Sequence, residues 1–422
     1  MSFKLYTYIA QKLWQTKLQK KSIAAPVVKI AEGSIVLGIA VMILTVSIVT
    51  GFKNEIKSKA VGFSGDVVIN AYTNNNSFEQ EPLSTQAPFL KDLQANKEIK
   101  HIQPFATKNA IIKTTDENQG IIIKGVDNNY DWTFIKQYLL EGSIPVYTDT
   151  ATSDKILISK PMALKLNAHV GDKLLTHFVS RKQVEDSSGQ SFGYEQRVRK
   201  YIVSGIYQTG FADVDDNIVF AHLKQVQRLN YWDSNQAGGF EIELNDYNAI
   251  EQQTEVINDA VGQNVEAKSV KQIYPTLFSW LSLLDSNAFI IIALMIAVAV
   301  INMISALLIL ILERSNTIGL LKSIGADNGL VQKIFLYQSF RMLLKGLVIG
   351  NVAGILICLL QQQFKFIKLP PESYYVSYVP VELHINQILM VNLLTIGACL
   401  LMMLLPVLIV SKINPVKTLR FK

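Results

Sequence analysis

The sequence lacks the features by which most enzymes are identified. No GxxxxGK[ST] phosphate-binding loop occurs, so the chain cannot hold a nucleotide in the P-loop manner. Its five histidines show no HExxH or other paired metal-ligand spacing. Ser64-Gly65 and Ser204-Gly205 lack the GxSxG context of a hydrolase nucleophile. We therefore expect a chain that is not an enzyme, with no catalytic residues, no metal and no cofactor of its own.

Cysteine is nearly absent. Only Cys358 and Cys399 occur, and both stand inside apolar runs, where small packing residues are common. The polar part of the chain therefore has no disulfide framework, and cysteine usage leaves its compartment undecided.

Long apolar runs are what the sequence has in excess. Of 422 residues, 49% are hydrophobic, and the mean hydropathy of +0.24 is too high for an average soluble protein and too low for one wholly within a membrane. A crossing needs about 20 apolar residues, and the chain has four such stretches, at 32–52, 286–312, 334–360 and 386–411. The first is too long for a signal-peptide core and has no small-x-small cleavage site before Phe52, which favours an uncleaved span.

Charge is divided unevenly between the polar and apolar parts. Residues 53–283 carry 23 basic and 28 acidic side chains, net −5, so the remainder, with 17 basic and 6 acidic, carries +11. Residues 1–31 contain six lysines and no acid, and Arg314 and Lys322 follow the second span. Basic residues gather on the cytoplasmic side of a membrane, so both termini are expected to be cytoplasmic and the large polar part to lie outside. The basic excess belongs to the membrane part, whereas a nucleic-acid-binding protein would need a basic face on a folded domain. The charge distribution therefore argues against nucleic-acid binding.

Residues 53–283 show short alternating runs typical of strands, interrupted by helical patterns. The expected strands include 66–69, 110–113, 121–124, 156–158 and 201–203, and the expected helices 89–96, 161–166, 223–229 and 248–261. We therefore expect a four-span α-helical membrane protein with a large α+β domain inserted between helices 1 and 2. In order, the segments are a basic amphipathic cytoplasmic segment (1–31), helix 1 (32–52), the α+β domain (53–283), helix 2 (286–312), a cytoplasmic turn (313–333), helix 3 (334–360), a short outer loop (361–385), helix 4 (386–411) and a cytoplasmic tail (412–422).

The turn after the second span is amphipathic. Ile318, Leu321 and Ile324 are spaced by three and could share one face of a short helix, which Gly325 is placed to end. From the residues alone, an ordinary cytoplasmic loop held at the membrane surface by its apolar face is favoured over a docking helix.

Small and polar residues in the spans indicate helix packing. Gly346, Gly350 and Gly354 fall on one helix face, the small-xxx-small arrangement that lets a neighbouring backbone approach, in the same chain or in a second protomer. The uncharged polar residues of the spans are expected to form interhelical hydrogen bonds; they are Asn302, Ser305, Asn351 and Asn392.

A protruding hairpin is expected in the polar domain. A strand beginning at Gly171-Asp172-Lys173-Leu174 leads into the polar run 180–191, and the chain returns through Arg197 to a strand at 201–207. The run is expected to be a long loop, and a solvated tip without a role is as good an interpretation as a binding site.

Four stretches resemble one family of permeases. They are ERSNTIGLLKSIGA at 313–326, the strand pair leading to YIVSGIYQTGFADVDDNIVF at 201–220, YYVSYVPV at 374–381 and NPVKTLR at 414–420. Together with the order of one span, a large domain and three spans, they resemble the FtsX-like ABC-transporter permeases, closest to the lipoprotein-releasing (LolC/LolE-type) permeases.

The resemblance implies a division of labour between subunits. In that family the turn after the second span is a coupling helix that binds a separate cytoplasmic ATPase, which holds the ATP and Mg. The implied ATPase-coupling positions are Glu313, Ile318, Gly319, Leu321, Lys322, Gly325 and Ala326.

The implied function is extraction of lipoproteins from the bacterial inner membrane and their transfer to a periplasmic carrier. The implied partners are two ATPase copies, a second or related permease, the lipoprotein and membrane lipids. In one permease type the hairpin binds the carrier. Here the resemblance implies Arg181, Lys182, Gln183 and Arg197 as the carrier-binding residues, although the loop lacks the proline associated with that contact. Alternatives are macrolide-exporter-type efflux and mechanotransmission to a periplasmic hydrolase, which is expected to need a smaller outer domain.

Overall fold

The computed structural model describes residues 24–72, 80–114, 117–148, 151–186 and 189–411. Most of the expected segment 1–31 and the tail 412–422 therefore lie outside the described residues. The chain divides into two units. Unit 1 comprises Met1–Lys53, Trp280–Lys368 and Tyr378–Lys422, and unit 2 comprises Asn54–Ser279 and Leu369–Ser377.

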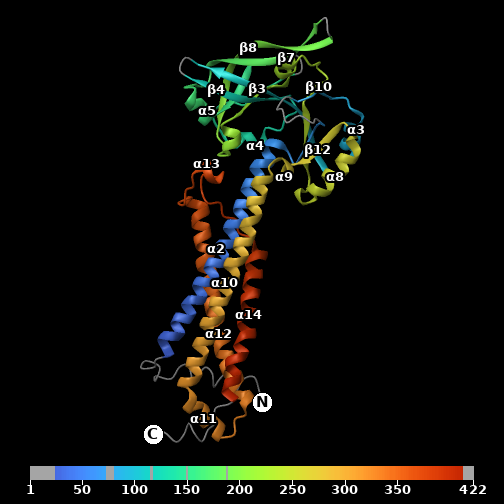
Figure 1. Ribbon diagram of the computed structural model, residues 1–422. Coiled ribbons are helices and arrows are strands. Elements are labelled where there is room, and N and C mark those ends of the chain that lie inside the picture. Colours follow the sequence, from blue (N-terminus) through green and yellow to red (C-terminus); the bar gives the residue numbers. More distant parts are fainter. Residues whose placement is uncertain (1–23, 73–79, 115–116, 149–150, 187–188, 412–422) are drawn as a thin grey trace. The chain divides into compact units, whose positions relative to one another are not determined.

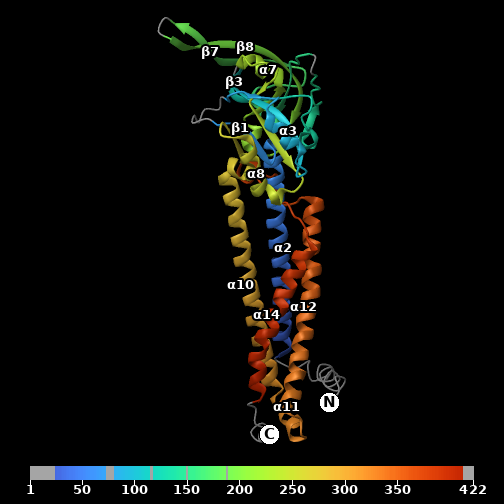
Figure 2. The ribbon, with the colours of Figure 1, turned by 90° about the vertical axis from the view of Figure 1, so that its right-hand side faces the viewer.

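Unit 1 is built from long apolar helices that run side by side (Figures 1 and 2). In the described part of the chain, four helices are long and apolar enough to span a membrane, namely α2 (Ala24–Ser64), α10 (Pro275–Glu313), α12 (Asn328–Phe364) and α14 (Ile385–Ser411). A short helix, α11 (Ser315–Ser323), connects α10 to α12. Side chains from all of these helices form one apolar core.

The glycines of α12 lie against α2 of the same chain. A Cβ added at Gly346 would lie 2.6 Å from the side chain of Ile35, and one added at Gly350 would lie 2.8 Å from Cβ of Ile39. At Gly354 it would lie 3.1 Å from the α2 backbone. Larger side chains would force the helices apart, so the glycine face serves packing within the chain.

A pair of asparagines joins α12 to α14. Asn351 donates to Oδ1 of Asn392 at 2.8 Å, and Asn392 donates back at 2.9 Å. The predicted interhelical hydrogen bond is therefore confirmed for these two residues. It is wrong for Ser305, whose hydroxyl donates to Ile301 of its own helix. The asparagine pair satisfies amides that would be costly to leave unpaired among apolar side chains.

Unit 2 contains a large mixed sheet, and the α+β expectation is confirmed. The strands run in the order β12-β1-β11-β3-β4-β9-β6-β8-β5, with β7 paired to β3 and β8. Pairs β4–β9 and β6–β8 are parallel, and the other pairs are antiparallel. The strands are β1 (Val67–Ala71), β3 (Ile99–Lys113), β4 (Asn118–Val126), β5 (Leu139–Gly142), β6 (Lys155–Ser159), β7 (Lys173–Asp186), β8 (Gly189–Tyr207), β9 (Ile218–His222), β11 (Gly239–Leu244) and β12 (Val265–Ser269).

Smaller elements surround this sheet. Strands β2 (Leu83–Ser84) and β10 (Gln236–Ala237) form a separate pair. Apolar residues of the sheet pack with those of α5 and α7 in a core of their own. The helices are α3 (Pro88–Ala95), α4 (Thr133–Lys136), α5 (Lys160–Lys165), α6 (Ala212–Asp215), α7 (Leu223–Asn230), α8 (Ile250–Val261), α9 (Val270–Ile273) and α13 (Pro371–Tyr374), with a 3₁₀ turn, η2, at Tyr247–Ala249.

The prediction of a long polar loop at the tip of the hairpin is wrong. β7 continues to Asp186 and β8 begins at Gly189, with the two strands in register from Lys173 opposite Ile202 to Asp186 opposite Gly189. The hairpin extends beyond the neighbouring strands (Figures 1 and 2). Where the hairpin extends past the neighbouring strands, its side chains do not have to alternate between apolar and polar. Backbone hydrogen bonds alone hold β7 and β8 together there. The sequence signal for strand is therefore absent there.

Helix α2 is longer than the span expected from the sequence. It continues from the expected end near Gly51 to Ser64, so its last residues belong to unit 2. Ile56, Ala60 and Phe63 repeat at helical spacing and are buried. Gly65, at φ +71°, ends the helix in the left-handed conformation that glycine adopts most easily.

Candidate functional site

Helix α11 has a firmly defined end. Gly325 has φ +93°, and its N–H donates to the carbonyl of Lys322 at 3.1 Å, while the N–H of Ala326 donates to Leu321 at 2.9 Å. These two bonds form a Schellman motif, which satisfies carbonyls that a helix end leaves open. The helix therefore presents a fixed surface.

The faces of α11 differ from the expected pattern. Ile318 is buried in the core of unit 1, Gly319 beside it is also buried, and Leu321 is half-buried. Ile324, expected on the same face as Ile318, is 75% exposed. Leu320, which the sequence reasoning missed, is 55% exposed one turn before it. Both faces of this helix carry apolar residues, so spacing alone cannot tell the inner face from the outer one.

The remaining expected coupling residues lie before, between and after these two exposed residues. Glu313 is the exposed last residue of α10, and Lys322 is a half-buried residue in the last turn of α11. Ala326 is partly buried against the core of unit 1. Exposed apolar residues on a short, well-capped helix suit contact with another protein. We call Leu320 and Ile324 the α11 apolar pair.

The hairpin of unit 2 has one described member of the expected binding set. Arg197 donates from Nη1 to the carbonyl of Arg228 at 2.9 Å, and its guanidinium lies 3.9 Å from the ring centre of Tyr231. This side chain is therefore engaged within the domain. The side chains of Arg181, Lys182 and Gln183 lie outside the described residues.

The base of the hairpin carries an exposed apolar face. Ile111, Leu175, Val179 and Val198 are each between 44% and 56% exposed. They come from the adjacent strands β3, β7 and β8, where Ile111 lies opposite His177 and His177 lies opposite Val198. We call these four residues the hairpin-base patch. The sequence reasoning missed it, because the signal is a contact between strands that are far apart in sequence.

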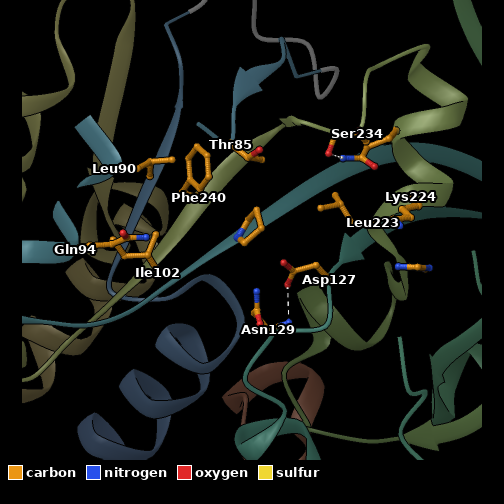
Figure 3. Close-up of a pocket in the computed structure, with 13 residues that line it drawn as sticks. Thr85, Leu90, Gln94, Ile102, Asp127, Asn129, Leu223, Lys224, Ser234 and Phe240 are labelled. Atoms are coloured by element: carbon orange, nitrogen blue, oxygen red, sulfur yellow. Dashed lines mark hydrogen bonds between the residues drawn. The ribbon is translucent and has the colours of Figure 1, made fainter. Parts of the chain in front are cut away.

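A cavity of about 320 Å³ lies between α3, β11 and α7. Figure 3 shows Leu90 and Phe240 on one side of it and Leu223 and Lys224 on the other. His222 also lines the cavity, but its Nδ1 accepts from the N–H of Ser153 at 3.1 Å and its ring stacks on a tyrosine. The histidine is thus held in a structural role. Among the described residues, no group of three or more His, Cys, Asp or Glu side chains could hold a metal ion.

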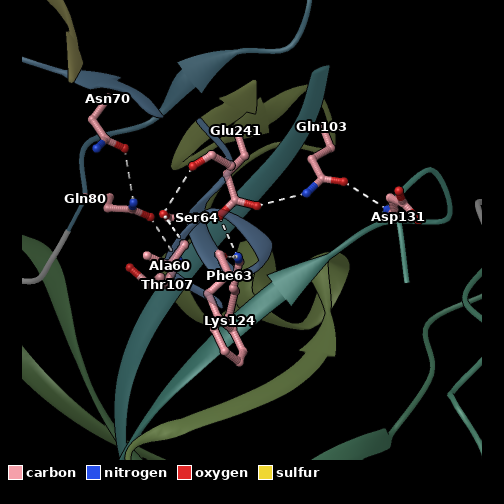
Figure 4. A network of polar contacts seen from close by, with 11 residues as sticks. Ala60, Phe63, Ser64, Asn70, Gln80, Gln103, Thr107, Lys124, Asp131 and Glu241 are labelled. Atoms are coloured by element: carbon pink, nitrogen blue, oxygen red, sulfur yellow. Dashed lines mark hydrogen bonds and ion pairs between the residues drawn. The ribbon is translucent and has the colours of Figure 1, made fainter. Parts of the chain in front are cut away.

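A buried ion pair lies at the end of α2 in unit 2 (Figure 4). Lys124 pairs with Glu241 at 2.5 Å and also donates to the carbonyl of Phe63. Both charged side chains are nearly inaccessible to water. Glu241 also accepts from Gln103, which in turn accepts from the N–H of Asp131. Three aromatic rings surround the ammonium at 5.4 to 5.8 Å; they are Phe105, Tyr130 and Phe220.

Two family models match the chain. The MacB-like periplasmic core domain matches residues 33–260, more than half of the chain. The FtsX-like permease C-terminal model matches residues 289–415. Together they cover most of the large domain, most of each span and all of α11.

Curated relatives match over nearly their whole length. The lipoprotein-releasing system transmembrane protein LolE of Haemophilus influenzae is 24% identical over 420 residues, covering 96% of this chain and 97% of the relative. The lipoprotein-releasing system transmembrane protein LolC of Neisseria meningitidis is 22% identical over 430 residues, covering both chains fully. Among solved structures, the periplasmic region of MacB from Actinobacillus actinomycetemcomitans matches with a TM-score of 0.33 and 11% identity, over 51% of this chain and 94% of that one.

Proposed function

Because the chain belongs to the FtsX-like permeases that carry a MacB-like periplasmic core domain, we propose that it is the permease subunit of an ABC transporter for lipoproteins. The transporter extracts lipoproteins from the bacterial inner membrane and hands them to a periplasmic carrier. The observation that carries the proposal is the full-length similarity to proteins named for lipoprotein release.

The energy for extraction comes from another subunit. The sequence has no phosphate-binding loop, and the similarity to ABC-transporter permeases supports a cytoplasmic ATPase, in two copies, that binds ATP and Mg. Removing an acyl chain from a bilayer costs about 0.8 kcal/mol for each CH₂ group. Spontaneous escape is therefore slow, and ATP hydrolysis supplies the difference.

Contact with the ATPase is made by α11 and its flanks. The α11 apolar pair supplies the exposed apolar area, and Glu313 and Lys322 supply charge beside it. Ile318, Gly319 and Ala326 act from inside, by holding α11 on unit 1. Gly325 fixes the end of the helix.

The four apolar helices support a location in the inner membrane. Both termini and α11 are cytoplasmic, and the large domain is periplasmic, because the basic residues concentrate at the ends of the chain and after the second span. Apolar side chains of α10, α12 and α14 remain widely exposed in the single chain. They contact lipids and a second permease, either an identical copy or a related chain.

Purification from the native membrane tests this function. Without nucleotide, mass spectrometry should find an ATPase and acylated lipoproteins bound to the permease, and ATP addition should release the lipoproteins. An outer-membrane channel in their place would indicate efflux. A cell-wall hydrolase in their place would indicate mechanotransmission.

The hairpin is proposed to bind the carrier. The hairpin-base patch offers exposed apolar area, and β7 carries Arg181, Lys182 and Gln183 beyond it. Arg197 contributes by fixing the base through Arg228 and Tyr231 rather than by direct contact.

Carrier transfer should depend on this patch. Replacing Val179 and Val198 by aspartate should lower transfer at least tenfold, because an interface would then bury charge. Val170→Asp alters an exposed valine away from the patch and should leave transfer within twofold. Transfer is measured as lipoprotein recovered with purified carrier. Equal transfer by the double variant and the Val170 control would contradict carrier binding at this patch.

A further inference from the structure

Unit 2 includes three described pieces of chain that lead to unit 1. They are the last residues of α2 (54–64), the stretch that starts α10 (275–279) with Tyr274 just before it, and the segment Leu369–Ser377, which contains α13. We propose that Phe211 is a positioning residue that ties these three pieces together, so that they move with the outer domain as one body during transport. The inference rests on the proposed function.

The ring of Phe211 contacts an aromatic ring from each piece. Its centre lies 6.3 Å from that of Phe63 in α2, with the rings nearly parallel at 16°. Tyr274 meets it edge-on at 6.1 Å, and Tyr375 meets it at 5.2 Å. The side chain of Phe211 is fully buried. Aromatic pairs at these separations are attractive beyond their burial, so one ring holds three segments that are far apart in sequence.

The turn that carries Phe211 is itself firmly held. The carboxylate of Asp215 accepts from the N–H of Gly210 at 2.8 Å and from the N–H and hydroxyl of Thr209 at 3.1 and 2.7 Å. The N–H of Phe211 in turn donates to the Thr209 hydroxyl at 3.1 Å. Burial raises the pKa of the Asp215 carboxyl, and these donors oppose that shift. Phe211 therefore cannot reorient without breaking a buried network.

Lys59 provides a second link between the end of α2 and the segment Leu369–Ser377. Its ammonium donates to the backbone carbonyl of Tyr375 at 3.0 Å and lies 3.8 Å from Glu55 of the same helix. Lys59 is 3% exposed. The segment Leu369–Ser377 is thus held to α2 by a buried charged hydrogen bond as well as through Phe211.

Removal of the Phe211 ring should loosen the connection between these pieces without disturbing the contact with the ATPase. Phe63, Tyr274 and Tyr375 each contact this one ring. Phe211→Ala would leave a cavity bordered by all three rings, and each piece would then be held less firmly. ATP hydrolysis would continue, because α11 is unchanged. Less lipoprotein would be released for each ATP hydrolysed, because the outer domain would follow the helices less closely.

The test compares Phe211→Ala with Phe240→Ala in the full complex in lipid nanodiscs. Phe240 is also buried, at 3% exposed, and lies in the same domain, but its ring pairs only with Phe89 among the aromatic contacts of the described residues. Phe211→Ala should keep ATP hydrolysis within twofold of wild type and lower lipoprotein released per ATP at least tenfold. It should also speed hydrogen exchange in peptides covering 369–377. Phe240→Ala should change neither the release ratio nor that exchange.

Two results would overturn the inference. One is an unchanged release ratio and unchanged exchange in Phe211→Ala; the other is the same loss in Phe240→Ala. Phe211→Leu, which keeps apolar volume and loses the ring, should fall between wild type and Phe211→Ala, and it carries the test if the alanine variant does not fold. If wild-type complex releases no lipoprotein, the proposed function fails, while hydrogen exchange still decides the role of Phe211.

Discussion

Replacing Leu320 and Ile324 together by aspartate should abolish ATP-driven release, with a loss of about a hundredfold or more. Burying a leucine or isoleucine side chain contributes about 1.5 to 3 kcal/mol, and a hundredfold change in binding corresponds to about 2.7 kcal/mol. Both side chains are exposed on α11, so the variant should insert and fold while losing the ATPase. The measurement is stimulation of the purified ATPase by permease in nanodiscs.

Two matched variants separate docking from folding. Ser323→Asp adds a charge to the exposed surface of the same helix without removing apolar area, and should retain stimulation within about threefold. Gly325→Asp should lose stimulation for another reason, because φ +93° strains any residue with a side chain and loosens the helix end. Full stimulation of the ATPase by the Leu320, Ile324 double variant would show that α11 is not the coupling surface.

Replacing Lys124 by methionine should destabilise unit 2 by about 3 to 5 kcal/mol, since it leaves the buried Glu241 carboxylate without its partner. The same change removes the donor to the Phe63 carbonyl at the end of α2. At about 2 to 4 °C per kcal/mol for a domain of this size, the Tm should fall by about 10 °C. Thermal unfolding of the full chain in detergent provides the measurement.

The double variant Lys124→Met, Glu241→Leu provides the control. Replacing a buried ion pair by apolar residues of similar volume is often neutral, so the double variant should recover most of the lost stability. A double variant no more stable than Lys124→Met alone would show that the loss comes from the Phe63 contact or from packing. A neutral Lys124→Met would show that the pair is dispensable.

The spans and the class of the outer domain could be predicted from sequence because their signals are local. Membrane thickness fixes the length of an apolar run, and alternation or helical spacing marks each strand or helix. The glycines of α12 were visible in the same way, through their spacing. Sequence could not tell that Ile35 and Ile39 of the same chain lie against them.

The features that sequence reasoning missed depend on long-range contacts or on burial. Strands β7 and β8 outside the sheet carry no apolar alternation, so the polar run at 180–191 suggested a loop. Leu320 and Ile318 are both apolar, and only packing shows which one is exposed. Phe211 stands in a stretch that the family resemblance singled out, but its three ring partners are separated from it by between 63 and 164 positions, and no periodicity connects them.

The central claim is that ATP hydrolysis on a partner subunit, coupled through α11, drives lipoproteins out of the membrane. The most direct measurement places permease, its ATPase and an acylated lipoprotein in lipid vesicles and follows lipoprotein transferred to soluble carrier after ATP addition. Release should require ATP and carrier, and should be absent with the Leu320, Ile324 double aspartate variant. Lipoprotein that stays in the vesicles while ATP is hydrolysed, or release that proceeds equally with the double variant, would contradict the account.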